Sequence, residues 1–125
     1  MKKILFALFL LLIVAGCTQE TTTQEQISFT AQIYDAENNL VLEKEITTTA
    51  GENAFDVLQK NNFPFKYEES TYGIFITKIF GITPEEGTYV AIYVDDEYAS
   101  VGLSDLELYN EMDLKFRIEE FPEFE

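Results

Sequence analysis

The stretch TYVAIYVDDEYASVG, residues 88–102, decides the fold of this chain. β-branched and aromatic residues dominate its first half, which is typical of a strand. The side chains alternate between two faces: Val90, Ile92 and Val94 on one, Tyr89, Ala91 and Tyr93 on the other. Three acids at 95–97 then predict a tight turn, and apolar sequence resumes at Tyr98. We expect the rest of the domain to pack around this strand.

Two alternating runs earlier in the chain predict a β-hairpin. Residues 27–36 and 40–49 each alternate apolar and polar side chains, the pattern of half-buried strands. The residues between them, Glu37-Asn38-Asn39, have turn chemistry, because asparagine tolerates a positive φ. The side chains expected to point inward are Ile27, Phe29, Ala31, Ile33, Leu40, Leu42 and Ile46.

Residues 50–62 change to the period of a helix. The stripe consists of Ala54, Val57, Leu58 and Asn61, at positions i, i+3, i+4 and i+7. Either Thr49 or Asn53 could cap the start, because each stands three residues before an acid. We prefer Asn53, which leaves Gly51 as a turn before the helix. Pro64 disfavours helical backbone at the residue before it and ends the helix.

Further strands are predicted at residues 65–70, 74–80 and 112–118, with one helical turn at 104–105. Within 74–80 we expect two faces: Phe75, Thr77 and Ile79 opposite Ile74, Ile76 and Phe80. A hairpin, a crossover helix and a return to strands indicate an α+β fold, a β-grasp-like mixed sheet packed on one short helix. A β-sandwich with a peripheral helix is the alternative.

The N-terminus has the order of a secretory signal. Two lysines precede twelve uncharged apolar residues, 4–15, which is shorter than the roughly 20 that a membrane-spanning helix needs. The following Val14-Ala15-Gly16-Cys17 resembles the lipobox of prokaryotic lipoproteins. That resemblance implies cleavage before Cys17 and a diacylglyceryl group on its thiol. The alternative is an ordinary signal peptide followed by a free cysteine.

These features predict three segments: a lipoprotein signal peptide at 1–16, a lipid-anchored tether at 17–26 and a domain at 27–121. Residues 18–26 carry no large apolar side chain and bury nothing. Nine flexible residues reach roughly 15–18 Å, so the domain would sit close to the bilayer. We expect a protein anchored to the cell membrane through Cys17 and facing outside the cytoplasm.

Composition excludes several functions. The formal charge is −15 and becomes −17 once Lys2 and Lys3 leave, with six basic against 23 acidic side chains, which excludes nucleic acid as a partner. The single cysteine allows no internal disulfide and would be consumed by lipid. There is no histidine, so the common nucleophilic triads and the commonest metal ligand are missing. We predict that the protein is not an enzyme.

Two groups of residues near the opening stretch are candidates for binding. Asp95, Asp96 and Glu97 could collect Ca²⁺, but they lack the alternate spacing of a calcium loop, and a solvated turn explains them. Four tyrosines lie in or shortly before the opening stretch, and we expect them near the rim of the domain: Tyr72, Tyr89, Tyr93 and Tyr98. Tyrosine is enriched at binding surfaces. Alternatively, Tyr89 and Tyr93 cover the second face of the sheet against the helix or hairpin.

Several short motifs, in the same order, resemble the transcobalamin-like C-terminal domain family. They lie within residues 40–118 and comprise Gly51, Ala54, Asp56, Val57 and Leu58; Tyr72-Gly73, Thr77 and Phe80-Gly81-Ile82; Tyr93 to Asp96, Ala99 and Gly102; and Leu108, Asn110-Glu111 and the last strand. The resemblance implies a β-grasp-like domain that covers cobalamin in vertebrate carriers and recurs in prokaryotic lipoproteins. This chain departs from it at Val90, where tryptophan is common, at Asp95-Asp96, where Asn-Gly is usual, and at Asn110-Glu111, where Gly-Asp is usual.

The sequence therefore predicts a non-catalytic binding module, with a cobalamin-like ligand implied by the resemblance and no metal. The candidate ligand-binding residues are Tyr72, Tyr93, Asp95, Asp96, Tyr98 and Gly102. A structural or protein-interaction module at the cell surface is the second hypothesis. A carboxylate enzyme is the third, and it requires two acids facing one cleft.

Overall fold

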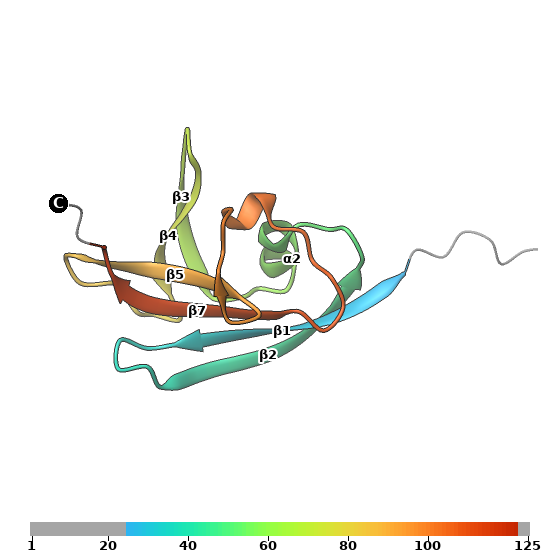
Figure 1. Ribbon diagram of the computed structural model, residues 1–125, viewed down its shortest axis with the longest axis horizontal. Coiled ribbons are helices and arrows are strands. Elements are labelled where there is room, and N and C mark those ends of the chain that lie inside the picture. The colour runs from blue at the N-terminus through green and yellow to red at the C-terminus, as the bar shows by residue number, and fades with distance from the viewer. Residues whose placement is uncertain (1–24, 123–125) are drawn as a thin grey trace, which may run out of the picture.

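The computed structural model describes residues 25–122; the predicted signal peptide, Cys17 and most of the tether lie outside this range. Its elements follow the predicted order (Figure 1). They are β1 (Gln26–Tyr34), β2 (Leu40–Thr49), α2 (Ala54–Lys60), β3 (Phe65–Ser70), β4 (Gly73–Ile79), β5 (Thr88–Val94), β6 (Glu97–Tyr98), the 3-10 turn η1 (Leu103–Asp105) and β7 (Asp113–Glu120). The first strand starts at Gln26, one residue inside the predicted tether.

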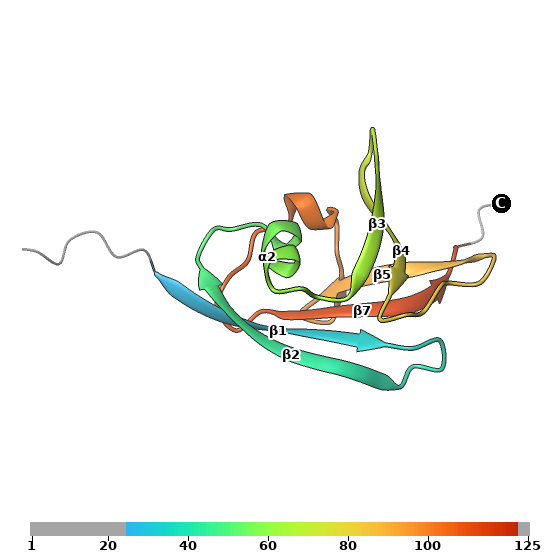
Figure 2. The same cartoon turned by 180° about the vertical axis from the view of Figure 1, so that it is seen from behind.

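Five strands form a mixed sheet in the order β2-β1-β7-β5-β6, and β3 and β4 form a separate hairpin. β1 and β7 run parallel, with Thr30 opposite Asp113, and the other neighbours are antiparallel. α2, η1 and the β3–β4 hairpin all lie on one side of this sheet (Figures 1 and 2). A mixed sheet with one short helix is confirmed. β7 occupies the middle of the sheet, and the strand of the opening stretch, β5, lies between β7 and the two-residue β6.

The core lies between α2 and the covered face of the sheet. The alternation predicted for β1 is confirmed: its inward side chains, Ile27, Phe29, Ala31 and Ile33, are all buried. Phe116 of β7 is fully buried and packs on Phe63, with the ring centroids 5.4 Å apart. Each large apolar side chain buried in this way contributes about 1.5–3 kcal/mol.

The helix begins at the preferred cap. Asp56 donates its backbone N–H to Oδ1 of Asn53 at 2.9 Å, which satisfies one of the free N–H groups of the first turn. Ala54, Val57 and Leu58 are buried as predicted. Asn61, the last member of the predicted stripe, instead donates its side-chain amide to the Val57 carbonyl at 2.8 Å and terminates the helix.

Two β-bulges change the predicted faces. In the β3–β4 hairpin Lys66 pairs with Lys78 and Tyr67 with Ile76, so Thr77 is an extra residue. The bulge reverses the alternation beyond it, and Ile76 and Ile79 are both buried although they were predicted on opposite faces. A second register shift in the β1–β2 hairpin leaves Leu40 47% exposed rather than inward.

Candidate functional site

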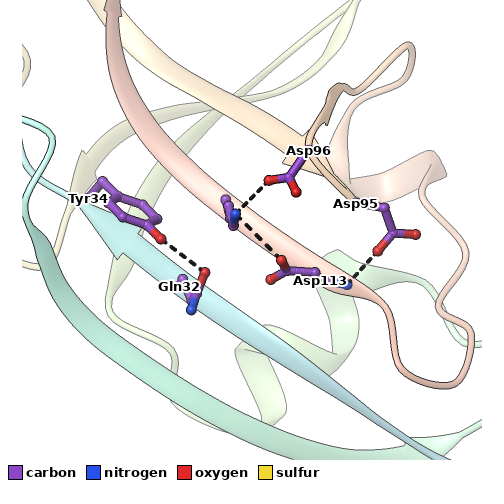
Figure 3. Close-up of polar contacts among 6 residues, drawn as sticks. Gln32, Tyr34, Asp95, Asp96 and Asp113 are labelled. Atoms are coloured by element: carbon purple, nitrogen blue, oxygen red, sulfur yellow. Dashed lines mark hydrogen bonds and ion pairs between the residues drawn. The ribbon is translucent and has the colours of Figure 1, made fainter.

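The acids of the opening stretch form a turn that is held by the strands below it. Asp95 and Asp96 have φ values of 50° and 69°, and they link β5 to β6 as a two-residue loop, the place where Asn-Gly is favoured. Asp95 accepts hydrogen bonds from the backbone N–H of Asp113 at 2.9 Å and from the hydroxyl of Tyr109. Asp96 accepts from Nζ of Lys115 at 2.5 Å, and Asp113 lies 3.6 Å from the same nitrogen (Figure 3).

These contacts shift the titration of the groups involved. The hydrogen bond from Lys115 lowers the pKa of Asp96, and the same bond raises the pKa of Lys115. The hydrogen bond to Asp95 raises the pKa of Tyr109 to about 12, with burial adding to it. Both predicted aspartates are therefore engaged in stabilising the turn, which favours a structural role over ligand binding.

Tyr93 lies on the sheet face that α2 does not cover. Its hydroxyl donates to Glu119, which raises the pKa of the phenol. Arg117 lies between Tyr93 and Tyr34, with its guanidinium carbon 5.0 and 5.2 Å from the two ring centroids. The expectation that Tyr89 and Tyr93 pack against the helix or hairpin is wrong, because alternation places them opposite Val90, and only Val90's face is covered.

The remaining predicted residues separate. Tyr72 is fully exposed at the tip of the β3–β4 hairpin, away from the groove that Tyr98 and Gly102 line. Tyr98 and Gly102 line a groove along β5. Tyr98 contacts Tyr93 edge-to-face at 5.7 Å and its hydroxyl lies 3.1 Å from that of Tyr89. The structure thus brings Tyr98 into contact with Tyr93 and into one groove with Gly102, and it leaves Tyr72 apart.

The groove, of about 770 Å³, lies between β4, β5 and the segment 98–102. Its apolar floor is formed by Ile74 and Ile76 from β4 and by Val90 and Ile92 from β5. The aromatic rim consists of Tyr89, Tyr98 and Phe121, with Phe121 stacked on Tyr89 at 4.8 Å. Burial, followed by the bond to Tyr98, raises the pKa of Tyr89. The only charged residues of its lining are Glu119 and Glu120.

Sequence reasoning missed most of this lining. Val101 and Phe121 are apolar side chains that line the groove and remain 42% and 51% exposed. Neither position belongs to an alternating run. The contact between β4 and β5 joins two different sheets, which no local pattern in the sequence predicts. The one available signal was the return to apolar sequence after the acidic turn, which continues through Val101 to Leu103.

The acidic side chains of the described residues are dispersed. Within residues 25–122, no three acidic side chains converge closely enough to hold a metal ion. The carboxylates of Asp95 and Asp96 turn toward different partners, Tyr109 and Lys115. The arrangement of this part of the chain is suited to non-covalent binding in an apolar groove.

Residues 51–120 match the family model described as Domain of unknown function (DUF4430), and the chain belongs to this family. Residues 1–18 match the prokaryotic membrane lipoprotein lipid attachment site, which indicates anchoring to a membrane by lipid. Between residues 25 and 122 each helix is too short to cross a bilayer. A comparison with curated protein sequences found no match.

Two solved structures share the fold. One is haptocorrin in complex with Cbi, with 22% identity, a TM-score of 0.68 and 82% of this chain covered. The chain spans only 27% of the haptocorrin chain. The other is a protein from Ruminococcus gnavus ATCC 29149 named for a suspected metal-binding role, with 16% identity, a TM-score of 0.65 and coverage of 77% of this chain and 99% of that one. The resemblance to transcobalamin-like proteins is confirmed at the level of fold.

Proposed function

We propose that this protein is a membrane-anchored, extracytoplasmic, non-catalytic binding module that captures its ligand in the groove along β5. The observation that carries this proposal is the combination of an open apolar floor with a rim of exposed aromatic side chains. Such clefts, with few polar groups, are the usual form of small-molecule sites. The carboxylates of the candidate site are engaged in structural contacts, which favours binding over catalysis.

The fold supports a finer assignment. A first hairpin, a helix across one sheet face and the parallel pairing of β1 with β7 are the features of a β-grasp domain, and we assign the domain at 27–121 to that class. The similarity to haptocorrin, which was solved with Cbi, makes a corrinoid the first ligand to test. A corrinoid is broad and largely flat, which suits an open groove better than an enclosed cavity.

A titration of the full chain in detergent with Cbi and with cobalamin, followed by visible absorbance, tests the ligand. We expect a saturable shift of the corrinoid bands. Val101→Asp puts a charge at the wall of the groove and should weaken binding at least about tenfold, because burying an unpaired carboxylate against the ligand is costly.

Tyr72→Ala is the matched control, because Tyr72 is fully exposed and lies outside the groove. It should bind corrinoid as the unaltered chain does. Flat titrations with both corrinoids would refute a corrinoid ligand. Equal affinity of Val101→Asp and the unaltered chain would refute the groove as its site.

A further inference from the structure

The outer edge of β5 is paired only at one end. β7 pairs with β5 from Thr88 to Val94, whereas β6 pairs only with Tyr93 and Val94. Ala99 adds one hydrogen bond, from its N–H to the Ile92 carbonyl at 2.9 Å, and the chain then leaves the edge. Among residues 25–122 no strand pairs with the first four residues of β5 on this side.

The main-chain groups at this edge are positioned for a further strand. In an antiparallel ladder, alternate residues direct both N–H and C=O to the same neighbour. Asp95 donates its N–H to the carbonyl of Asp113, so the odd-numbered residues of β5 face β7 and the even-numbered ones face the edge. Val90, which is only 7% exposed, therefore directs its N–H and C=O toward the open edge, where nothing described pairs with them. Nearly buried main-chain groups are usually paired.

The groove surrounds this edge from both sides of the sheet. Ile74 and Ile76 line it on the covered side, and Tyr89 and Tyr98 line it on the open side. A strand added beside Val90 would direct alternate side chains to these two walls, since successive residues of a strand point to opposite faces. Edge strands are usually protected by charges, prolines or bulges, and the open part of β5, TYVA, has none of these.

The negative charge around the open edge of β5 favours a positively charged binding partner. Glu119 and Glu120 are the only charged residues of the lining, and the whole chain carries a formal charge of −15. A second copy of this chain would bring the same acids face to face. A positively charged segment would be attracted and oriented by the field.

We propose that the open edge of β5 binds an extended, basic segment of a partner protein, which joins the five-stranded sheet as an added strand opposite Thr88–Ala91. Main-chain hydrogen bonds supply affinity, and the two walls of the groove select alternate side chains. The inference rests on the proposed function only in taking the same groove as the binding site. The ligand proposed for the groove is here a polypeptide segment instead of a small molecule.

The probe is a labelled eight-residue peptide with a lysine at each end and alternating threonine and valine between them. It is added to the full chain in detergent, and amide hydrogen exchange is followed by NMR. The amide of Val90, which faces the open edge and has no partner among the described residues, should gain at least about tenfold protection. The amides of Tyr89 and Ala91, already paired with β7, should not change. Protection at alternate residues is a signature that side-chain binding alone would not produce.

Two controls separate main-chain pairing from charge. Replacing each threonine of the peptide by proline removes its donors and should weaken binding at least about tenfold in fluorescence anisotropy. Glu120→Lys, at an exposed position, should weaken the original peptide several-fold at low salt. No binding, or binding without protection of Val90, overturns strand addition.

The outcomes also separate this inference from the corrinoid proposal. If the peptide binds with alternate protection and both corrinoid titrations are flat, strand addition stands and the small ligand fails. If a corrinoid binds and the peptide leaves Val90 unprotected, strand addition alone fails.

Discussion

At the scale of single residues, Tyr109 shows that the carboxylates of this acidic chain form structural hydrogen bonds. Its hydroxyl donates to Asp95, and Asp95 also accepts from the backbone of Asp113, so one carboxylate joins the turn to the start of β7. A neutral phenol can donate this bond, whereas a phenolate would repel the carboxylate. The contact therefore makes the titration of Tyr109 a reporter of the fold.

We predict that Tyr109 loses its proton near pH 12 in the folded chain, above the ordinary value for tyrosine. A pKa raised by folding contributes stability that is complete below about pH 10 and is lost as the pH rises through the folded value. Absorbance titration near 295 nm measures it. Tyr109→Phe should remove a transition near pH 12, and Asp95→Asn should move that transition to lower pH. An unchanged titration in Tyr109→Phe would contradict the assignment.

At the scale of elements, the β5–β6 turn adopts the left-handed backbone of an Asn-Gly loop with two aspartates. That conformation costs roughly 1–2 kcal/mol for a residue other than glycine, although aspartate tolerates it better than most. Asp95 offsets the cost by satisfying the N–H of Asp113, and Asp96 by its bond to Lys115. Only the first of these contacts satisfies a main-chain group.

Glycine should therefore be tolerated better at position 96 than at position 95. Asp96→Gly relieves backbone strain and loses only a solvent-exposed, screened ion pair, so its free energy of unfolding should equal or exceed that of the unaltered chain. Asp95→Gly relieves the same strain but leaves the Asp113 N–H and the Tyr109 hydroxyl without their acceptor, so it should be about 1 kcal/mol less stable than Asp96→Gly. Urea denaturation of both variants measures the difference, and a more stable Asp95→Gly would contradict this explanation.

At the scale of the whole molecule, the domain depends on the contact between its first and last strands. β7 pairs with β1 on one side and with β5 on the other, so it joins the N-terminal hairpin to the strand that carries the groove. Phe116 lies in this strand, fully buried and packed on Phe63 beyond the helix. A cavity at Phe116 therefore weakens the packing of β7 against both the N-terminal hairpin and β5.

Phe116→Ala should destabilise the domain by about 3–5 kcal/mol, a large part of the 5–15 kcal/mol that holds most domains. Thermal or urea unfolding followed by circular dichroism measures the loss. Leu40→Ala is the control, because Leu40 is about half exposed beside a bulge and should cost less than about 1 kcal/mol. Similar losses in both variants would contradict the central role of β7.

Local patterns in the sequence determined much of this structure. The alternation of Ile27 to Ile33, the Asn53 cap and the turn at Asp95-Asp96 depend on near neighbours, and all three were predicted correctly. The order of strands and helix followed from the same patterns, and the family motifs led to the shared fold.

Only the tertiary structure decided which strands are neighbours, which sheet face is covered and where the groove lies. The pairing of Thr30 with Asp113 joins residues far apart in the chain, and alternation is equally consistent with several strand orders. Bulges such as the one at Thr77 reverse a face without a clear sequence signal. The sequence placed the candidate site at the acidic turn, whereas the structure places it along the edge of β5. The reason is that β6 is too short to cover that edge, and strand length and pairing are decided by the tertiary structure.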